Sequence, residues 1–190
     1  MLYLIIILIA TLLICGVNLV FMVPFSLLEI ATVVFSTLLG VVAIIAIDGI
    51  SALIIRRLTP TSWYSPERKV FKVSKKERDF YKKLKIKQWK DKVPELGGFT
   101  SFHKDKLVST DDEAYLERFI LEANYGVVIH LANAILGFLI AFIPLCSSPS
   151  IWIPIVAVNF LLSLLPVAIL RYTSYTLHNL YVRCNKKNNK

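Results

Sequence analysis

The stretch TDDEAYLERFILEANYGVVIHLANAILGFLIAFI, residues 110–143, decides the fold. It opens with Thr110 and Glu113 at the spacing of a capping box, in which each side chain bonds the backbone N–H of the other residue. No proline interrupts the stretch before Pro144, so the sequence predicts one continuous helix to about Ile143. The first turns are charged and the remainder is apolar. This pattern predicts a helix that begins in water and ends in lipid.

Polar and small side chains recur along one side of this predicted helix. At about 100° per residue they fall in a single sector. Its members are Tyr115, Arg118, Glu122, Gly126, His130, Asn133 and Gly137. Such a stripe would lead from the aqueous end of the helix into the bilayer, so we expect the chemistry of the protein along it.

The composition is that of an integral membrane protein. Of the 190 residues, 56% are hydrophobic, and the mean hydropathy is +0.62, which is too apolar for a soluble domain. The formal net charge of +9 is concentrated, because Arg56 to Lys106 holds 16 Lys and Arg against 6 Asp and Glu. Basic segments beside membrane spans predict the cytoplasmic side and contact with anionic head groups. No nucleic-acid motif accompanies them, which disfavours a nucleic-acid partner. The 3 cysteines are widely spaced and indicate neither a disulfide framework nor a metal site.

The chain is predicted to be an all-α integral membrane protein with four transmembrane helices arranged as two hairpins. The spans lie at about 2–21, 27–55, 120–143 and 151–170. They form a single membrane domain over 1–190, with a basic cytoplasmic loop at 56–110 and a basic cytoplasmic tail at 171–190. The positive-inside rule places both termini in the cytoplasm and the protein in the cell membrane. Ser74 and Glu77 form a second capping box, which opens a basic amphipathic helix on the membrane surface that ends at Pro94.

His130 is the strongest candidate for a catalytic residue. It is the only histidine within a predicted span, and an ionisable side chain at that depth is costly and typical of a functional site. Imidazole changes protonation near neutral pH, so it can act as general base on a hydroxyl. The alternative is a neutral histidine that hydrogen-bonds to Asn133 or to a neighbouring span and serves packing. Glu122 lies about 12 Å of helix before His130, as a second catalytic or substrate-binding candidate or as an ordinary helix acid.

Other polar positions within the spans favour structural interpretations. Asp48 either faces the stripe or pairs with Arg56 or Arg57, and the second is favoured. Small and polar side chains that we interpret as packing contacts are Cys15, Asn18, Asn159 and Ser163. The lysines of the loop could bind the phosphates of an acyl carrier, but a run of charge by itself favours anionic lipid.

The loop and the striped helix together resemble a known family. KQWKDKVPELGGF, residues 87–99, is similar to the loop signature of the glycosyl-4,4'-diaponeurosporenoate acyltransferases, small membrane enzymes of carotenoid synthesis. FHKDKL at 102–107, YLERFILE at 115–122 with His130 eight residues later, and Pro166 with Arg171-Tyr172 also fit that pattern. The chain departs from the pattern at Tyr125 and Val127, where the family has an arginine and an acid, and at 173–176.

The resemblance implies an acyltransferase that moves a fatty acyl group onto a hydroxyl of a glycosylated or other amphiphilic lipid. It implies no bound cofactor and no metal, with acyl-CoA or a lipid as acyl donor. His130 and Glu122 would be catalytic. The implied substrate contacts are Trp89, Lys90, Asp91, Asn133 and Arg171. The alternative is a non-catalytic membrane module that binds anionic lipid or a partner protein through the basic loop. The acceptor, the effect of the departures and the oligomeric state stay open.

Overall fold

The described part of the chain is helical throughout. The computed structural model describes residues 2–21, 26–93 and 109–188, and within these ranges it contains helices and no strand. The long helices are α1 (Leu2–Phe21), α2 (Leu27–Leu58), α5 (Glu113–Leu136) and α6 (Pro149–Asn188). Short ones are η1 (Thr61–Tyr64), η2 (Lys69–Phe71), α3 (Lys75–Lys83), α4 (Ile86–Trp89), η3 (Lys90–Lys92), η5 (Gly137–Phe142) and η6 (Pro144–Cys146). Four helical segments, with η5 continuing α5, are long and apolar enough to cross a membrane, which confirms the predicted fold class.

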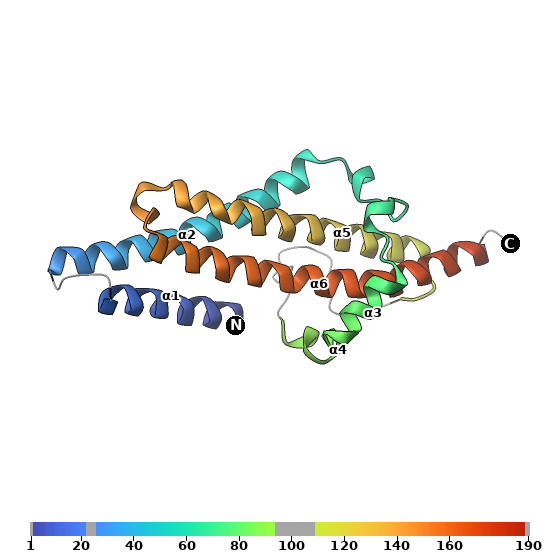
Figure 1. Ribbon diagram of the computed structural model, residues 1–190. Coiled ribbons are helices and arrows are strands. Elements are labelled where there is room, and N and C mark those ends of the chain that lie inside the picture. The colour runs from blue at the N-terminus through green and yellow to red at the C-terminus, as the bar shows by residue number, and fades with distance from the viewer. Residues whose placement is uncertain (1, 22–25, 94–108, 189–190) are drawn as a thin grey trace. The chain divides into compact units, whose positions relative to one another are not determined.

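The chain forms two compact units. The first unit consists of residues 1–53 and 131–164, and the second of residues 54–130 and 165–190. Within the first unit, α1 and the start of α2 run in opposite directions, as do the end of α5 with η5 and the start of α6 (Figure 1). The prediction of a single membrane domain stays a prediction.

The first unit has an aliphatic core with a polar patch beside it. Its core residues are Ile14, Ile44, Ile140, Ile151, Ile155 and Val156. Close to these, Ser51 donates a hydrogen bond to the side chain of Asn133, and the Asn159 amide donates to the Asn133 carbonyl at 3.2 Å. Gly137 packs against Asn159 so closely that an added Cβ would lie 2.7 Å from its Nδ2. The polar side chains in this part of the membrane region are therefore packed with little spare room.

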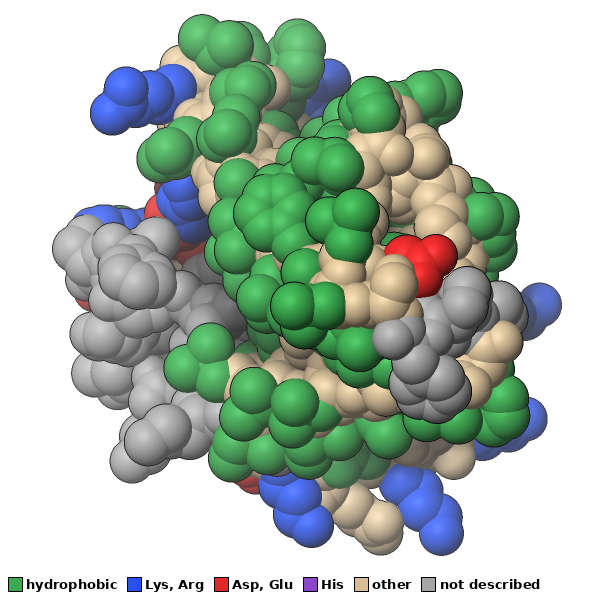
Figure 2. Space-filling model, turned by 90° about the vertical axis from the view of Figure 1, so that its left-hand side faces the viewer, with side chains coloured by type: hydrophobic (Ala, Val, Ile, Leu, Met, Phe, Trp, Pro, Cys, Tyr) green, Lys and Arg blue, Asp and Glu red, His purple; other side chains and the backbone are tan. Residues whose placement is uncertain are grey.

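Hydrophobic side chains turned outward are typical of lipid contact. Leu4, Leu8 and Leu12 of α1 are 65%, 59% and 63% exposed. Hydrophobic side chains cover much of the face drawn in Figure 2, and Lys and Arg lie mainly toward its edges. Water cannot be the solvent for such a surface, so the exposed apolar faces agree with four membrane-crossing helices.

The second unit packs the first turns of α5 against the last turns of α6. Leu116, Phe119 and Ile120 of α5 share a core with Leu177 and Cys184 of α6. Within the predicted tail, residues 171–188 continue α6 as helix. The physical reason is that apolar side chains recur beyond Leu170 at helical spacing and bury themselves against α5.

Two helix boundaries also differ from the sequence prediction. The third long helix begins at Glu113, and Asp112 instead of Thr110 caps it, because the Asp112 carboxylate accepts a hydrogen bond from the Tyr115 N–H at 3.0 Å. The α-helix ends at Leu136 and continues as the 3-10 helix η5. Ile143, which precedes Pro144, is extended with φ −80° and ψ 117°, as the proline ring requires.

The predicted amphipathic helix after Ser74 is broken in two. Ser74 caps α3 as expected, since its hydroxyl accepts a hydrogen bond from the Glu77 N–H at 3.1 Å. Lys85 then adopts a left-handed conformation with φ 54°, and α4 begins at Ile86. Ile86 is fully buried, so burial of this side chain accompanies the change of direction.

Candidate functional site

An ion pair joins α2 to α5 in the second unit. Arg56 Nη2 lies 2.9 Å from Glu122 Oε2, and the two side chains are 31% and 14% exposed. The sequence favoured pairing of Asp48 with Arg56 or Arg57, and the resemblance implied a catalytic role for Glu122. In the structure Arg56 pairs with Glu122, 66 residues away, so the Glu122 carboxylate accepts a charge-assisted hydrogen bond.

Two stacked tyrosine rings lie beside the Arg56–Glu122 ion pair, one on α5 and one in the segment that follows α2. The Arg56 guanidinium lies 5.4 Å from the centre of the Tyr125 ring, and Tyr125 stacks on Tyr64 with ring centres 3.7 Å apart. The Tyr64 hydroxyl lies 2.8 Å from the Thr59 hydroxyl, and the buried Asn124 amide donates to the Tyr64 carbonyl at 2.8 Å. These contacts fix the chain after α2 against α5. From the sequence, Tyr125 was noted only as a departure and Asn124 was missed, although an asparagine on an otherwise apolar helix face was an available signal.

A second arginine site holds α3 against α6. Arg171 Nε and Nη2 each lie 2.8 Å from a different oxygen of Glu77, and its Nη1 donates to the Val70 carbonyl at 3.2 Å. One turn along α6, the Arg78 guanidinium lies over the ring of Tyr175, 4.4 Å from the ring centre. Arg171, expected to bind substrate, thus makes a bidentate contact within the protein.

Tyr81 lies next to the ion pair of Arg171 and Glu77, and its pKa is affected by this position. Burial, followed by the negative charge of Glu77, raises the pKa of Tyr81, which lies next to this ion pair. A raised phenol pKa means that Tyr81 stays protonated across the physiological range. It therefore contributes a neutral hydroxyl beside the Arg171–Glu77 contact.

The loop residues of the predicted substrate site lie at the end of α4. The Trp89 indole N–H donates to the Leu84 carbonyl at 3.0 Å, and the Lys90 ammonium lies 3.4 Å from the carboxylate of Asp91. The Asp91 side chain is 81% exposed. The remainder of the loop signature, residues 94–108, lies outside the described residues. The structure therefore shows only the first half of the motif, with local contacts and a solvent-facing carboxylate.

His130 and Asn133 stand on the same predicted stripe but belong to different units. His130 is half-buried and ends the α5 portion of the second unit, about 12 Å of helical rise beyond Glu122. Asn133 belongs to the first unit, where its side chain and carbonyl accept hydrogen bonds from Ser51 and Asn159. Asp48 also lies in the first unit. Its carboxylate has Asn159 as a hydrogen-bond partner, while its buried Oδ1 has none among the described residues.

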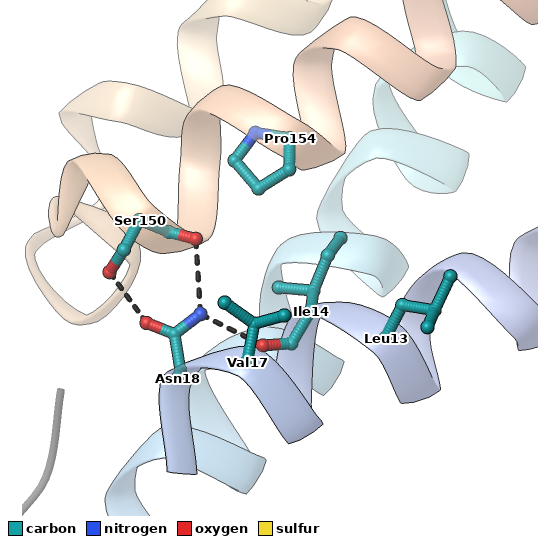
Figure 3. A pocket seen from close by; sticks show the side chains of 6 residues that line it. All are labelled: Leu13, Ile14, Val17, Asn18, Ser150 and Pro154. Carbon is teal, nitrogen blue, oxygen red and sulfur yellow. Dashed lines mark hydrogen bonds between the residues drawn. The ribbon is translucent and has the colours of Figure 1, made fainter. Parts of the chain in front are cut away.

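A cavity of about 210 Å³ lies elsewhere in the first unit, where the end of α1 meets the start of α6. Figure 3 shows Leu13, Ile14 and Val17 along one side and Pro154 opposite them. The Asn18 side chain is saturated at its rim, since it donates to the Ile14 and Ser150 carbonyls at 2.8 and 3.1 Å and accepts from the Ser150 hydroxyl. This agrees with a packing role for Asn18, and none of the predicted site residues lines the cavity.

The part of the chain that the structure describes contains no cluster of side chains that could bind a metal ion. No group of three or more His, Cys, Asp and Glu side chains converges there. Groups in the second unit that could act chemically include an imidazole on α5, the Arg56–Glu122 pair and a lysine-rich α3–α4 segment.

Four helical segments long and apolar enough to cross a membrane, one of which carries a half-buried histidine, are typical of a multi-pass membrane protein with a candidate acid–base group. Residues 60–183 match the family model described as glycosyl-4,4'-diaponeurosporenoate acyltransferase. The chain therefore belongs to that family of acyltransferases, as the loop motif predicted. No curated protein and no solved structure matches the chain. The matched range includes every predicted site residue, whereas α1 and α2 precede it entirely.

Proposed function

We propose that the protein transfers a fatty acyl group to a hydroxyl of a glycosylated or other amphiphilic lipid. Coenzyme A or a membrane lipid carries the acyl group before transfer. The family match over residues 60–183 is the observation that carries this proposal. The four apolar helical segments support it further, because both the acyl chain and the acceptor would be lipid-soluble.

His130 acts as general base in this proposal. Its imidazole takes the proton of the acceptor hydroxyl while that oxygen attacks the acyl carbonyl carbon. A new C–O bond forms, and the bond between the carbonyl carbon and the donor sulfur or oxygen breaks. The imidazolium then returns the proton to the leaving group, so no external oxidant, reductant or metal is required.

The surrounding residues take supporting roles. Glu122 holds Arg56 instead of acting as a second base, because the two form an ion pair at 2.9 Å. Trp89, Lys90 and Asp91 lie at the cytoplasmic mouth and contact the substrates. Asn133 orients the acceptor or the helix that carries His130, and Arg171 positions α3 through Glu77. The membrane around the protein includes anionic lipids, which the lysines of α3 and α4 attract.

The proposal is tested with purified full-length protein in lipid vesicles. The assay supplies a labelled acyl-CoA or a labelled phospholipid together with a glycolipid acceptor, and it measures the acylated product. We expect His130→Ala to lower the rate by about 100-fold or more, the usual contribution of a general base. His178→Ala removes a histidine from α6 and should keep the activity. Unchanged activity in folded His130→Ala would refute the assignment of the base.

One observation favours a second function, that of a non-catalytic membrane module. Lys82, Lys83 and Lys85 are exposed, and next to them Phe80 and Leu84 are 56% and 47% exposed. Basic and apolar side chains together are typical of segments that bind an anionic membrane surface. If this is the function, reversing the charge of the three lysines abolishes it while His130→Ala has no effect.

A further inference from the structure

Two arginines of the second unit use their guanidinium groups differently. All three nitrogens of Arg171 donate hydrogen bonds, two to Glu77 and one to the Val70 carbonyl. Arg56 donates only through Nη2, to Glu122. Its Nε and Nη1 have no hydrogen-bond partner among the described residues, and its side chain is 31% exposed. Every nitrogen of Arg171 is therefore engaged, whereas Arg56 keeps a donor edge with unengaged N–H groups.

The position of this donor edge is fixed by its neighbours. Glu122, whose side chain is only 14% exposed, holds one end of the guanidinium, and the ring of Tyr125 lies against it at 5.4 Å. Tyr125 is in turn stacked on Tyr64. A guanidinium held in this way is a pre-organised fork, the geometry that suits the oxygens of a phosphate.

The surroundings favour an anion even though Glu122 neutralises one charge. Arg57 follows directly in the sequence, and Arg56 to Lys106 holds 16 Lys and Arg against 6 Asp and Glu. The field of this segment is positive, so it attracts anions to its surface. Hydrogen bonds from the Arg56 fork would then hold the anion in place, while the wider charge raises its local concentration.

We propose that Arg56 binds a phosphate group of the acyl donor. The inference rests on the proposed function, because only acyl transfer makes the anion a donor. The phosphate belongs either to a soluble carrier such as coenzyme A or to the head group of a phospholipid donor. Glu122 lies about 12 Å of helical rise before His130, so a phosphate held beside it leaves the acyl group to extend along α5. Arg56 precedes the matched residues 60–183, and family membership therefore does not assign it this role.

The test measures equilibrium binding without any acyl transfer. Full-length protein is placed in nanodiscs of phosphate-free glycolipid and titrated with radiolabelled coenzyme A or with short-chain phosphatidylglycerol. The wild type should bind one of these probes saturably, which identifies the source of the phosphate. Arg56→Gln should weaken this binding about tenfold, the usual effect of losing hydrogen bonds to a charged group. Arg56→Lys, which keeps the charge but loses the fork, should show an intermediate loss.

Arg57→Gln is the matched control, because it removes the same charge from the next, exposed residue. It should weaken binding less than twofold if the fork, and not diffuse charge, holds the phosphate. Since Arg56→Gln takes the ion-pair partner from Glu122, the double variant Arg56→Gln/Glu122→Gln checks that lost binding is not lost folding, and it should show the same weakening. Equal weakening in the Arg56 and Arg57 variants, or no saturable binding of either probe to the wild type, would overturn the proposal. If binding depends on Arg56 but the wild type forms no acylated product in the separate acyl-transfer assay, only the proposed function would be refuted.

Discussion

Arg171 shows at the scale of one residue how the sequence and the structure suggest different roles. The family resemblance suggested substrate binding for this residue. The structure shows a bidentate contact with Glu77, with side chains 17% and 28% exposed. The contact joins residues 94 positions apart, and no local pattern in the sequence identifies such a partner.

This contact predicts a loss of stability when Arg171 is changed. Arg171→Gln should lower the free energy of unfolding by about 1–3 kcal/mol, because charge-assisted hydrogen bonds to a partly buried carboxylate are lost. The measurement is denaturant unfolding of the purified protein in detergent micelles. Arg183→Gln, on the exposed side of α6, is the control and should change stability by less than about 0.5 kcal/mol. If Arg171→Gln kept full stability but lost activity, the residue would be a substrate contact.

The candidate site was predictable only in part at this scale. Periodicity placed Glu122 and His130 on one stripe of one helix, since both positions depend only on local spacing. Arg56 and Tyr64 could not be assigned to the site, because their partners on α5 lie 60 or more positions away in the sequence. The role of Tyr125 as a stacked ring likewise depends on a residue from another element.

At the scale of elements, capping residues were informative where one candidate stood alone. Ser74 has no competing cap, and it caps α3 as predicted. At the start of α5, Thr110, Asp111 and Asp112 are all suitable caps, and Asp112 takes the role. The break at Lys85 could not be predicted, because no glycine or proline marks it and the left-handed conformation falls on a lysine.

The hydrogen bond from the Glu77 N–H to the Ser74 hydroxyl should stabilise α3. Ser74→Ala should destabilise this nine-residue helix by about 0.5–2 kcal/mol, because the Glu77 N–H loses its acceptor. Hydrogen exchange of the α3 amides measures the effect, and faster exchange is expected in α3 with no change in α5. Ser74→Asp restores an acceptor and should restore protection. Equal exchange in Ser74→Ala and wild type would show that Arg171 and Glu77 alone hold the helix.

At the scale of the whole molecule, hydropathy predicted the four helical segments because each is a long apolar run. Hydropathy identified only the membrane span of α6, whose 40 residues extend well beyond the apolar run that ends near Leu170. Its last turns are amphipathic and pack through Leu177 and Cys184. The division into two compact units depends on contacts between distant residues and has no signal in composition.

The predicted topology can be checked by cysteine labelling. In a background with the three native cysteines replaced, Ser148→Cys in the turn before α6 should react with a membrane-impermeant maleimide in intact cells. Lys76→Cys on α3 should react only after the membrane is permeabilised, because the positive-inside rule places the basic loop in the cytoplasm. Labelling of Lys76→Cys in intact cells would show that the loop lies outside the cell. A cytosolic acyl donor could then not reach it.

The most direct test of acyl transfer by His130 is comparative lipid mass spectrometry of cells that produce the wild type or His130→Ala at equal levels. The wild type should yield a lipid whose mass exceeds that of its acceptor by one fatty acid less one water, and His130→Ala should lack it. Identical lipid profiles in wild-type, His130→Ala and protein-free cells would contradict the account.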